Sequence, residues 1–398
     1  MVDYALKSWC EISQVALRAN VRALRLGLNP KATFGVVVKS NAYGHGMVLC
    51  AKAFLNAGVD WLIVNSLDEV EELRQGGVDA PIYLCVQPAP FEAERVVESG
   101  ARIALCSVEV ATAIAAAARR QRRVVRCHVK VETGTNRQGV SDDELIGLVQ
   151  SVHRLDGLAL EGLTTHFADI EDTTDHRFAR GQIEALAAAV SAVRGLGIEV
   201  PMVHAANSAA TLLWPETHGD LVRVGIAAYG LWPSRETYAA VLQRSGDAIE
   251  LCPVLSWKAR IAQIKEVPEG DYIGYGRTFR ATHAMRIGIV PLGYYEGYDR
   301  RLSNLGHVLV EGIRAPVRGR VCMNMFMIDL THVEGVCPGQ VVTLMGQDGS
   351  EAVSAEMWGD WLSSIHYEAI SRIHVNQVRL LRTQEGALCA LEDLVSDE

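Results

Sequence analysis

No stretch of this 398-residue sequence holds the roughly 20 consecutive apolar residues that a membrane-spanning helix needs. The N-terminus lacks a basic region followed by an apolar segment, which predicts that there is no secretory signal. The nine cysteines are odd in number and never spaced C-x-x-C. This pattern argues against a disulfide framework and against a zinc site, and it fits a reducing compartment. We therefore expect a cytoplasmic protein that neither crosses nor binds a membrane.

The sequence also lacks the positive charge that nucleic-acid binding requires. Its formal net charge is −9, which would repel phosphates. The single basic run, over residues 119–123, directly follows an alanine-rich stretch over residues 108–118, where cations stabilise the C-terminal end of a helix. We expect no nucleic-acid partner.

What the sequence does contain is a regular alternation of short β-rich runs and segments with a helical pattern. The β-rich runs cover residues 33–39, 60–66, 80–87, 101–107, 124–132, 160–167, 202–208 and 221–230. Several of the intervening helical segments open with Ser and close with Gly, the usual start and stop signals. Eight such units over roughly 200 residues predict a (β/α)₈ barrel of parallel strands. A doubly wound open sheet is disfavoured, because no G-x-G-x-x-G follows the first strand.

The pattern changes after about residue 245. Short apolar or alternating runs, separated by turn signals such as Pro268-Glu269-Gly270, predict a mostly-β domain with little helix before residue 355. We predict a barrel domain over residues 12–245 and a β-domain over residues 246–398, with residues 1–11 packing on the β-domain.

Polar side chains gather where the predicted barrel strands end, the place where barrels carry their chemistry. In chain order they are Lys39 and Tyr43, Lys130 and Arg137, His166, His204 with Asn207 and Ser208, and Arg223 with the Gly225-Ile226 backbone. Singly, each has an ordinary explanation: a core histidine, an Asn-Ser helix cap, or an arginine paired with a carboxylate. Their convergence from five strand ends favours a common site.

The chemistry of this set favours a phosphorylated aldehyde held by a lysine. The hydroxyls of Tyr43 and Ser208 and the backbone N–H groups near Gly225 can surround a phosphate. The set has no carboxylate cluster and no third zinc ligand beside the two histidines, so no metal is expected. A lysine at a strand end forms a Schiff base with an aldehyde, and pyridoxal 5'-phosphate is the matching cofactor.

Six motifs in order along the chain together resemble the alanine racemase family. They read V-V-V-K-S-N-A-Y-G-H-G, T-H-F, H-A-A-N-S-A-A, R-V-G-I-A-A-Y-G, G-Y-G-R-T-F and G-R-V-C-M-N-M-F-M-I-D-L. The resemblance runs from Trp9 to Tyr367, nearly the whole chain. It implies a homodimer whose active sites borrow residues from the partner's β-domain. It also implies interconversion of L- and D-alanine, which supplies D-alanine for peptidoglycan in the cell wall.

The resemblance assigns roles to individual residues. Lys39 would carry the cofactor as an internal aldimine and exchange the Cα proton on one face, and Tyr275 of the other subunit would exchange it on the opposite face. Arg223 would face the pyridine nitrogen, which weakens the ring as an electron sink. His166 and Arg223 are expected to act as cations beside the two bases. The remaining cofactor-binding residues implied are Tyr43, His166, Asn207, Ser208, Gly225, Ile226 and Tyr367.

Four further residues are implied around the substrate. Arg137 and Met323 would bind its carboxylate end, and Tyr294 would narrow the entrance. Lys130 takes the place of a lysine that is often carbamylated in this family; pairing with a carboxylate such as Glu132 is an equally good interpretation. Asn324 stands where Asp is frequent, which leaves the strictness of alanine specificity open.

Two alternatives to alanine racemisation remain at this point. One is a racemase of serine, lysine or several amino acids. The other is a non-catalytic pyridoxal phosphate-binding protein, although such proteins are usually lone barrels, without a β-domain to carry Tyr275 and Tyr367.

Overall fold

The computed structural model describes residues 6–246 and 249–390. Its chain divides into two compact units. The barrel unit comprises residues 16–40 and 50–252, and the β-unit comprises the described parts of residues 1–15, 41–49 and 253–398. The predicted domain boundary after residue 245 adjoins residues 247–248, which lie outside the described residues, as do residues 1–5 of the predicted N-terminal segment.

Eight parallel strands form the barrel unit. They are β2 (Thr33–Val37), β3 (Trp61–Val64), β4 (Ile82–Leu84), β5 (Arg102–Leu105), β6 (Val125–Lys130), β7 (Leu158–Thr164), β8 (Met202–His204) and β9 (Leu221–Val224). They are ordered β8-β7-β6-β5-β4-β3-β2-β9, so the sheet curls almost into a closed barrel. Every one of the eight predicted strands is present, and the prediction of a (β/α)₈ fold is confirmed.

The barrel closes differently between β8 and β9. Among the described residues these two strands share no ladder. Single backbone hydrogen bonds join their chain segments instead, from Asp220 N to Val203 O at 3.0 Å and from Arg223 N to Ala206 O at 2.9 Å.

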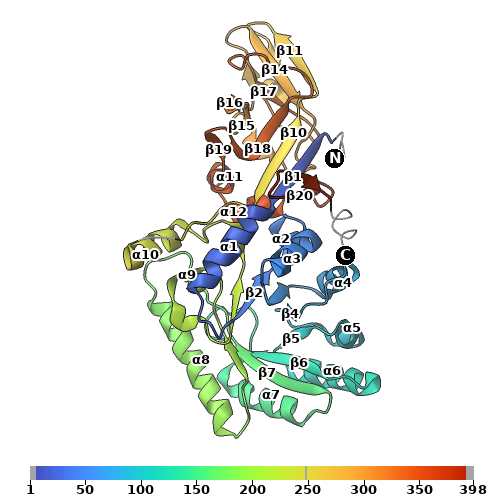
Figure 1. Ribbon diagram of the computed structural model, residues 1–398, viewed down its shortest axis with the longest axis vertical. Coiled ribbons are helices and arrows are strands. Elements are labelled where there is room, and N and C mark those ends of the chain that lie inside the picture. Colours follow the sequence, from blue (N-terminus) through green and yellow to red (C-terminus); the bar gives the residue numbers. More distant parts are fainter. Residues whose placement is uncertain (1–5, 247–248, 391–398) are drawn as a thin grey trace. The chain divides into compact units, whose positions relative to one another are not determined.

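Helices alternate with these strands and lie outside the sheet (Figure 1). They are α1 (Gln14–Gly27), α3 (Met47–Asn56), α4 (Leu67–Gln75), α5 (Ala93–Ser99), α6 (Val108–Gln121), α7 (Asp142–Arg154), α8 (Arg177–Gly195), α9 (Ser208–Leu213) and α10 (Arg235–Ser245). The serines expected to start helices do so: Ser66 Oγ accepts from Glu69 N, and Ser107 Oγ accepts from Val110 N. Strands such as β3 are buried on both faces, which explains their continuous apolar sequence.

The β-unit is mostly strand, as predicted. Its principal sheet contains β16 (Ile313–Pro316), β15 (His307–Val310), β18 (Val341–Asp348), β10 (Leu255–Arg260), β1 (Ser8–Ser13), β20 (Val378–Arg382) and β21 (Leu388–Cys389), with β19 (Glu351–Val353) paired to β18. A second sheet contains β11 (Gln263–Val267), β14 (Met285–Val290) and β17 (Phe326–Asp329), and a hairpin joins β12 (Tyr272–Ile273) to β13 (Phe279–Arg280). The helix expected over residues 355–370 is two helices, α11 (Ala355–Leu362) and α12 (His366–Ser371), because Ser363 has a φ of +50°.

A short left-handed turn follows the first barrel strand. Lys39 was expected to end that strand, but β2 ends at Val37 and Lys39 begins α2 (Lys39–Tyr43). Four successive residues of α2, Ser40 to Tyr43, have φ values of 53° or 54°. Residues other than glycine pay roughly 1–2 kcal/mol each for this conformation, so the surrounding contacts must hold it.

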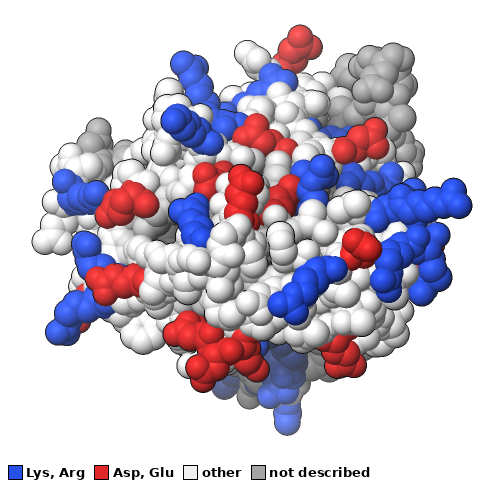
Figure 2. Space-filling view, turned by 90° about the horizontal axis from the view of Figure 1, so that it is seen from below, with Lys and Arg blue, Asp and Glu red and all other residues white. Residues whose placement is uncertain are grey.

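The charged side chains on the face shown in Figure 2 are of both signs and are interspersed. This face therefore carries no surface of one sign. Among the described residues, no helix is long and apolar enough to span a membrane.

Candidate active site

Five of the predicted site residues gather in the barrel unit. Lys39, Lys130, Arg137 and Arg223 all lie close enough to His166 to act on its charge. Burial, and then these four cations, hold the pKa of His166 well below its ordinary value. His166 is therefore neutral at pH 7, and the expectation that it acts as a cation is wrong.

Arg223 is the most deeply enclosed of these cations. It is only 7% exposed. Its guanidinium donates to Thr165 O at 2.8 Å, to Ala205 O at 3.0 Å and to His204 Nδ1. Among the described residues, no carboxylate forms an ion pair with it.

Lys130 ends β6 and is 9% exposed. Burial, followed by Arg223 and Arg137, lowers its pKa. Pairing with Glu132 does not occur among the described residues, since that carboxylate instead accepts from Gly134 N at 2.7 Å and from Arg137 N at 3.3 Å. Arg137 itself lies exposed on the loop after β6.

Three of the residues predicted to bind phosphate, Ser208, Gly225 and Ile226, meet where β9 ends. Ser208 is buried, and its Oγ accepts from Gly225 N at 2.9 Å and from Ala227 N at 3.4 Å. Ile226 starts the 3₁₀ turn that follows. Converging N–H groups beside a buried hydroxyl suit an anion, and Lys39 is one of the four cations that act on His166, so this donor set fits a phosphorylated aldehyde.

Asn207 has a structural role in this chain, as the N-cap of α9. Its Oδ1 accepts from Ala210 N at 2.9 Å and caps α9, and its Nδ2 donates to Glu171 Oε1 at 2.8 Å. Helix capping, the ordinary explanation of the Asn-Ser pair, is therefore present.

The β-unit carries the other predicted residues. The rings of Tyr43 and Tyr367 lie 6.1 Å apart between centroids. Tyr294 N donates to Cys322 O at 3.0 Å, which brings the Tyr294 loop beside Met323. Tyr275, Met323 and Tyr294 are 74%, 54% and 42% exposed in this single chain.

Asn324, which departs from the family pattern, pairs with Glu296. Asn324 Nδ2 donates to Glu296 Oε1 at 2.7 Å, and Glu296 Oε2 accepts from Gly293 N at 2.8 Å. Asn324, next to Met323, is thereby fastened to the Tyr294 loop.

Sequence reasoning missed the buried polar residues His128 and Thr164 of the barrel strands and the neighbouring Thr165, together with the partly buried Glu161 that contacts His128. A signal was present for His128, because alternation along β6 puts it on the same face as Lys130. Glu161 had no such signal, since its direction depends on a local irregularity of β7.

An eight-stranded β/α barrel with a lysine among cations, a buried hydroxyl and converging N–H groups defines a pyridoxal phosphate-dependent enzyme. The family model for the alanine racemase N-terminal domain matches residues 12–233, and that for the C-terminal domain matches residues 254–381. The chain belongs to the alanine racemase family, whose enzymes are amino-acid racemases.

Individual relatives match over nearly their whole length. An alanine racemase of Leptospira interrogans is 36% identical over 376 residues, 94% of this chain and 95% of the relative. The structure of alanine racemase from Bacillus anthracis with bound L-Ala-P has a TM-score of 0.89 and 32% identity, covering 97% of each chain. Alanine racemase from Bartonella henselae, solved with covalently bound pyridoxal phosphate, shares the fold with a TM-score of 0.81, at 24% identity over 94% of this chain and 99% of that one.

Proposed function

We propose that this chain interconverts L-alanine and D-alanine, with Lys39 and Tyr275 moving the Cα proton on opposite faces of the substrate. The family match along both units carries the proposal. Its relatives are named alanine racemases, and one was solved with bound L-Ala-P.

In this proposal the barrel unit holds the cofactor. Lys39 binds its aldehyde, Ser208 with the backbone of Gly225 and Ile226 binds its phosphate, and Arg223 faces the ring nitrogen. Tyr43 and Tyr367 contribute hydroxyls to the phosphate, and His166 and Asn207 line the site. When bound, pyridoxal phosphate withdraws electrons from Cα and so makes its proton removable. Arg223 keeps the ring nitrogen unprotonated, because a donor-only cation opposes a second positive charge there.

Arg137 and Met323 orient the substrate carboxylate. A guanidinium on an exposed loop needs a partner to hold it, and we assign that task to carbamylated Lys130. Burial and the neighbouring arginines favour the neutral amine of Lys130. The neutral amine adds to CO₂, forms an N–C bond and releases one proton, which leaves an anion beside Arg137.

Tyr275 acts at the barrel of a second copy. Tyr275 is 74% exposed in the single chain, and the exposed Met323 and Tyr294 belong to the same unit. All three side chains are therefore accessible to a second copy of the chain. The assembly is thus a homodimer with shared sites, in which Tyr294 narrows the entrance. The nine cysteines are free, in keeping with a cytoplasmic enzyme that supplies D-alanine for peptidoglycan.

Isotope exchange tests the proposal. In heavy water, the enzyme should convert L-alanine to D-alanine and place deuterium at Cα of both enantiomers. Lys39→Ala should abolish the yellow, borohydride-reducible adduct, and Tyr275→Phe should suppress exchange from one enantiomer far more than from the other. Lys31→Ala and Tyr272→Phe, at exposed positions outside the proposed site, serve as matched controls. A colourless wild type would end the cofactor assignment. If deuterium enters L-alanine but no D-alanine appears, the role of Tyr275 as the second base is contradicted.

The same assay tests specificity. Serine and lysine, presented at the same concentration as alanine, should be racemised more slowly if Met323 and Arg137 fit the smaller substrate. Equal rates would instead identify a broad amino-acid racemase.

A further inference from the structure

A line of hydrogen bonds runs through the barrel interior from Arg223. Its guanidinium meets His204 Nδ1, His204 Nε2 lies 2.9 Å from His128 Nδ1, and His128 Nε2 lies 3.0 Å from Glu161 Oε2. The four residues come from β9, β8, β6 and β7. Both imidazoles are almost fully buried, at 1% and 0% exposed.

The groups at the two ends of the line, Arg223 and the ionised Glu161, together determine the donor at each step. A guanidinium only donates, so His204 Nδ1 must accept and its hydrogen must sit on Nε2. His204 Nε2–H then donates to His128 Nδ1, and His128 Nε2–H donates to Glu161. The reverse arrangement would place an N–H of His204 against an N–H of Arg223. Burial also lowers the pKa of both histidines, which keeps each neutral and able to accept.

The backbone of β7 is shaped to complete this line. The register with β6 passes from Cys127↔Leu160 to His128↔Gly162, so Glu161 is the extra residue of a bulge. Bulges redirect a side chain, and here the side chain is the carboxylate. Gly162 makes room for the imidazole, since a Cβ there would lie 2.6 Å from His128 Nδ1.

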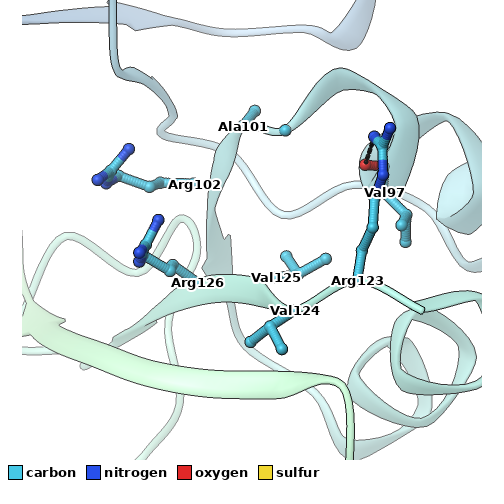
Figure 3. Close-up of a pocket in the computed structure, with 8 residues that line it drawn as sticks. Val97, Ala101, Arg102, Arg123, Val124, Val125 and Arg126 are labelled. Carbon is cyan, nitrogen blue, oxygen red and sulfur yellow. Dashed lines mark hydrogen bonds between the residues drawn. The ribbon is translucent and has the colours of Figure 1, made fainter. Parts of the chain in front are cut away.

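Two further arginines hold the carboxylate. Arg102 Nε lies 2.9 Å from Glu161 Oε2, the oxygen that His128 also faces, and Arg126 Nε lies 3.4 Å from Oε1. Burial raises the pKa of Glu161, but the hydrogen bond from His128 and these two cations outweigh it, so the net pKa is lowered and the group stays ionised. Both arginines line a hollow of about 200 Å³, with Arg123 on its other side bonded to Val97 O (Figure 3).

We propose that Glu161 and His128 are positioning residues of the racemase, which fix the tautomer of His204 and thereby hold the Arg223 guanidinium at the cofactor's ring nitrogen. Glu161 acts from the far end of the line and balances the buried charge of Arg223 through two neutral rings. The part concerning the ring nitrogen rests on the proposed function; the fixed tautomers do not.

Two substitutions at Glu161 separate the loss of the acceptor from the loss of the charge. Glu161→Leu removes the oxygen that accepts from His128, so His128 is no longer held with its hydrogen on Nε2 and both histidines can take the opposite tautomer. Glu161→Gln keeps the acceptor, because its amide oxygen can take the place of Oε2 beside His128 and Arg102, with its NH₂ in the place of Oε1. Glu11→Gln, at a buried carboxylate of β1 paired with Lys258 at 3.3 Å, is the matched control.

The first measurement uses the cofactor-free protein. Nitrogen NMR of ¹⁵N-histidine-labelled chains should show Nε2–H at His204 and His128 in the wild type, in Glu11→Gln and in Glu161→Gln, whereas Nδ1–H should appear at both in Glu161→Leu. A wild-type His204 with Nδ1–H, or unchanged tautomers in Glu161→Leu, would overturn the proposal. His128→Phe, which removes the acceptor, should shift the His204 signals as well, and melting curves confirm that each variant is folded.

The second measurement uses the loaded enzyme. A displaced Arg223 allows the ring nitrogen to take a proton, which favours transfer of the amino group from alanine to the cofactor, leaving pyruvate and pyridoxamine phosphate. The ratio of this transfer to racemisation should rise at least about tenfold in Glu161→Leu, with a changed absorbance of the bound cofactor, and stay constant in Glu11→Gln. Switched tautomers with an unchanged ratio would overturn the positioning role. A wild type that neither binds the cofactor nor racemises alanine would instead remove the proposed function, and the tautomer result would stand by itself.

Discussion

At the scale of single residues, buried cations define this site. Lys130 and Arg223 are removed from water without a carboxylate partner among the described contacts, an arrangement that proteins keep where an anion is to be bound. Both were predictable, because Lys130 stands at the end of a predicted barrel strand and Arg223 stands inside one whose other residues are apolar. His128 and Glu161 were not, since the bulge that turns Glu161 toward His128 depends on register, which alternation in one strand cannot reveal.

Lys130→Ala should lower kcat/KM for L-alanine about 10- to 100-fold, because Arg137 loses the group that orients it. Added acetate should restore part of the rate by supplying a small carboxylate. Growth or incubation with ¹³C-bicarbonate should give a carbamate signal by NMR in the wild type and in Lys31→Ala but not in Lys130→Ala. Full activity of Lys130→Ala, with no such signal in the wild type, would contradict the assignment.

At the scale of elements, alternation of apolar runs and helix caps located all eight barrel strands, but it placed their ends too late. The error at Lys39 has a physical cause. Residues 40–43 take a left-handed conformation that their own preferences oppose, and contacts made by residues distant in sequence hold it: Arg379 donates to Gly44 O at 2.9 Å and 3.1 Å. Such contacts cannot be read from a local pattern.

Replacing a glycine by alanine should have opposite effects on stability at this left-handed turn and inside an ordinary helix. Gly44 has a φ of +85°, and a Cβ there would lie 2.1 Å from Ile370 O, so Gly44→Ala should lower the free energy of unfolding by about 2–4 kcal/mol. Gly147, inside α7, has open space around it, so Gly147→Ala should raise that free energy by about 0.5–1 kcal/mol. Denaturant titration measures both; equal effects would mean that the turn is not rigid.

The turn should also make stability depend on pH. Burial lowers the pKa of His45 to about 4, with Arg379 adding to this effect, although its bonds to Ala42 O and Tyr43 O oppose it. An unfolded histidine titrates near 6.5, so between pH 6.5 and 4 the unfolded chain binds the extra proton. The contribution is therefore complete above pH 6.5 and lost as the pH falls toward 4, by up to about 3 kcal/mol.

His45→Asn keeps an N–H donor but does not titrate, so its stability should fall less over that interval. His153→Asn, on the exposed face of α7, should follow the wild type. Parallel curves for His45→Asn and the wild type would mean that His45 is not the responsible group.

At the scale of the whole molecule, the proposed sharing of sites predicts that two inactive variants restore activity when they form a mixed dimer. Lys39→Ala and Tyr275→Phe should each be inactive as homodimers. In a mixed dimer, one site unites an intact Lys39 with an intact Tyr275. Random pairing of equal amounts makes half of the dimers mixed, so activity should return to about a quarter of wild type.

Co-expression with two different affinity tags isolates the mixed dimer, in which one intact site of two should give about half of wild-type activity. The control is co-expression of Lys39→Ala with Lys39→Gln, which should restore nothing. Absence of activity in purified mixed dimers would contradict the exchange of residues between subunits.

The join between β8 and β9 has a consequence for how the barrel comes apart. Of the eight pairs of neighbouring barrel strands, seven are joined by β-ladders among the described residues, whereas β8 and β9 are joined by isolated backbone hydrogen bonds. Amide hydrogens of Asp220 and Arg223 should therefore exchange with solvent before those of β5 and β6, and the barrel should begin to unroll at this line. Ser208 follows β8 and Arg223 lies in β9, so a ligand bound to both residues would hold the two strands together. Binding of the cofactor should therefore slow amide exchange between β8 and β9 more than anywhere else in the sheet.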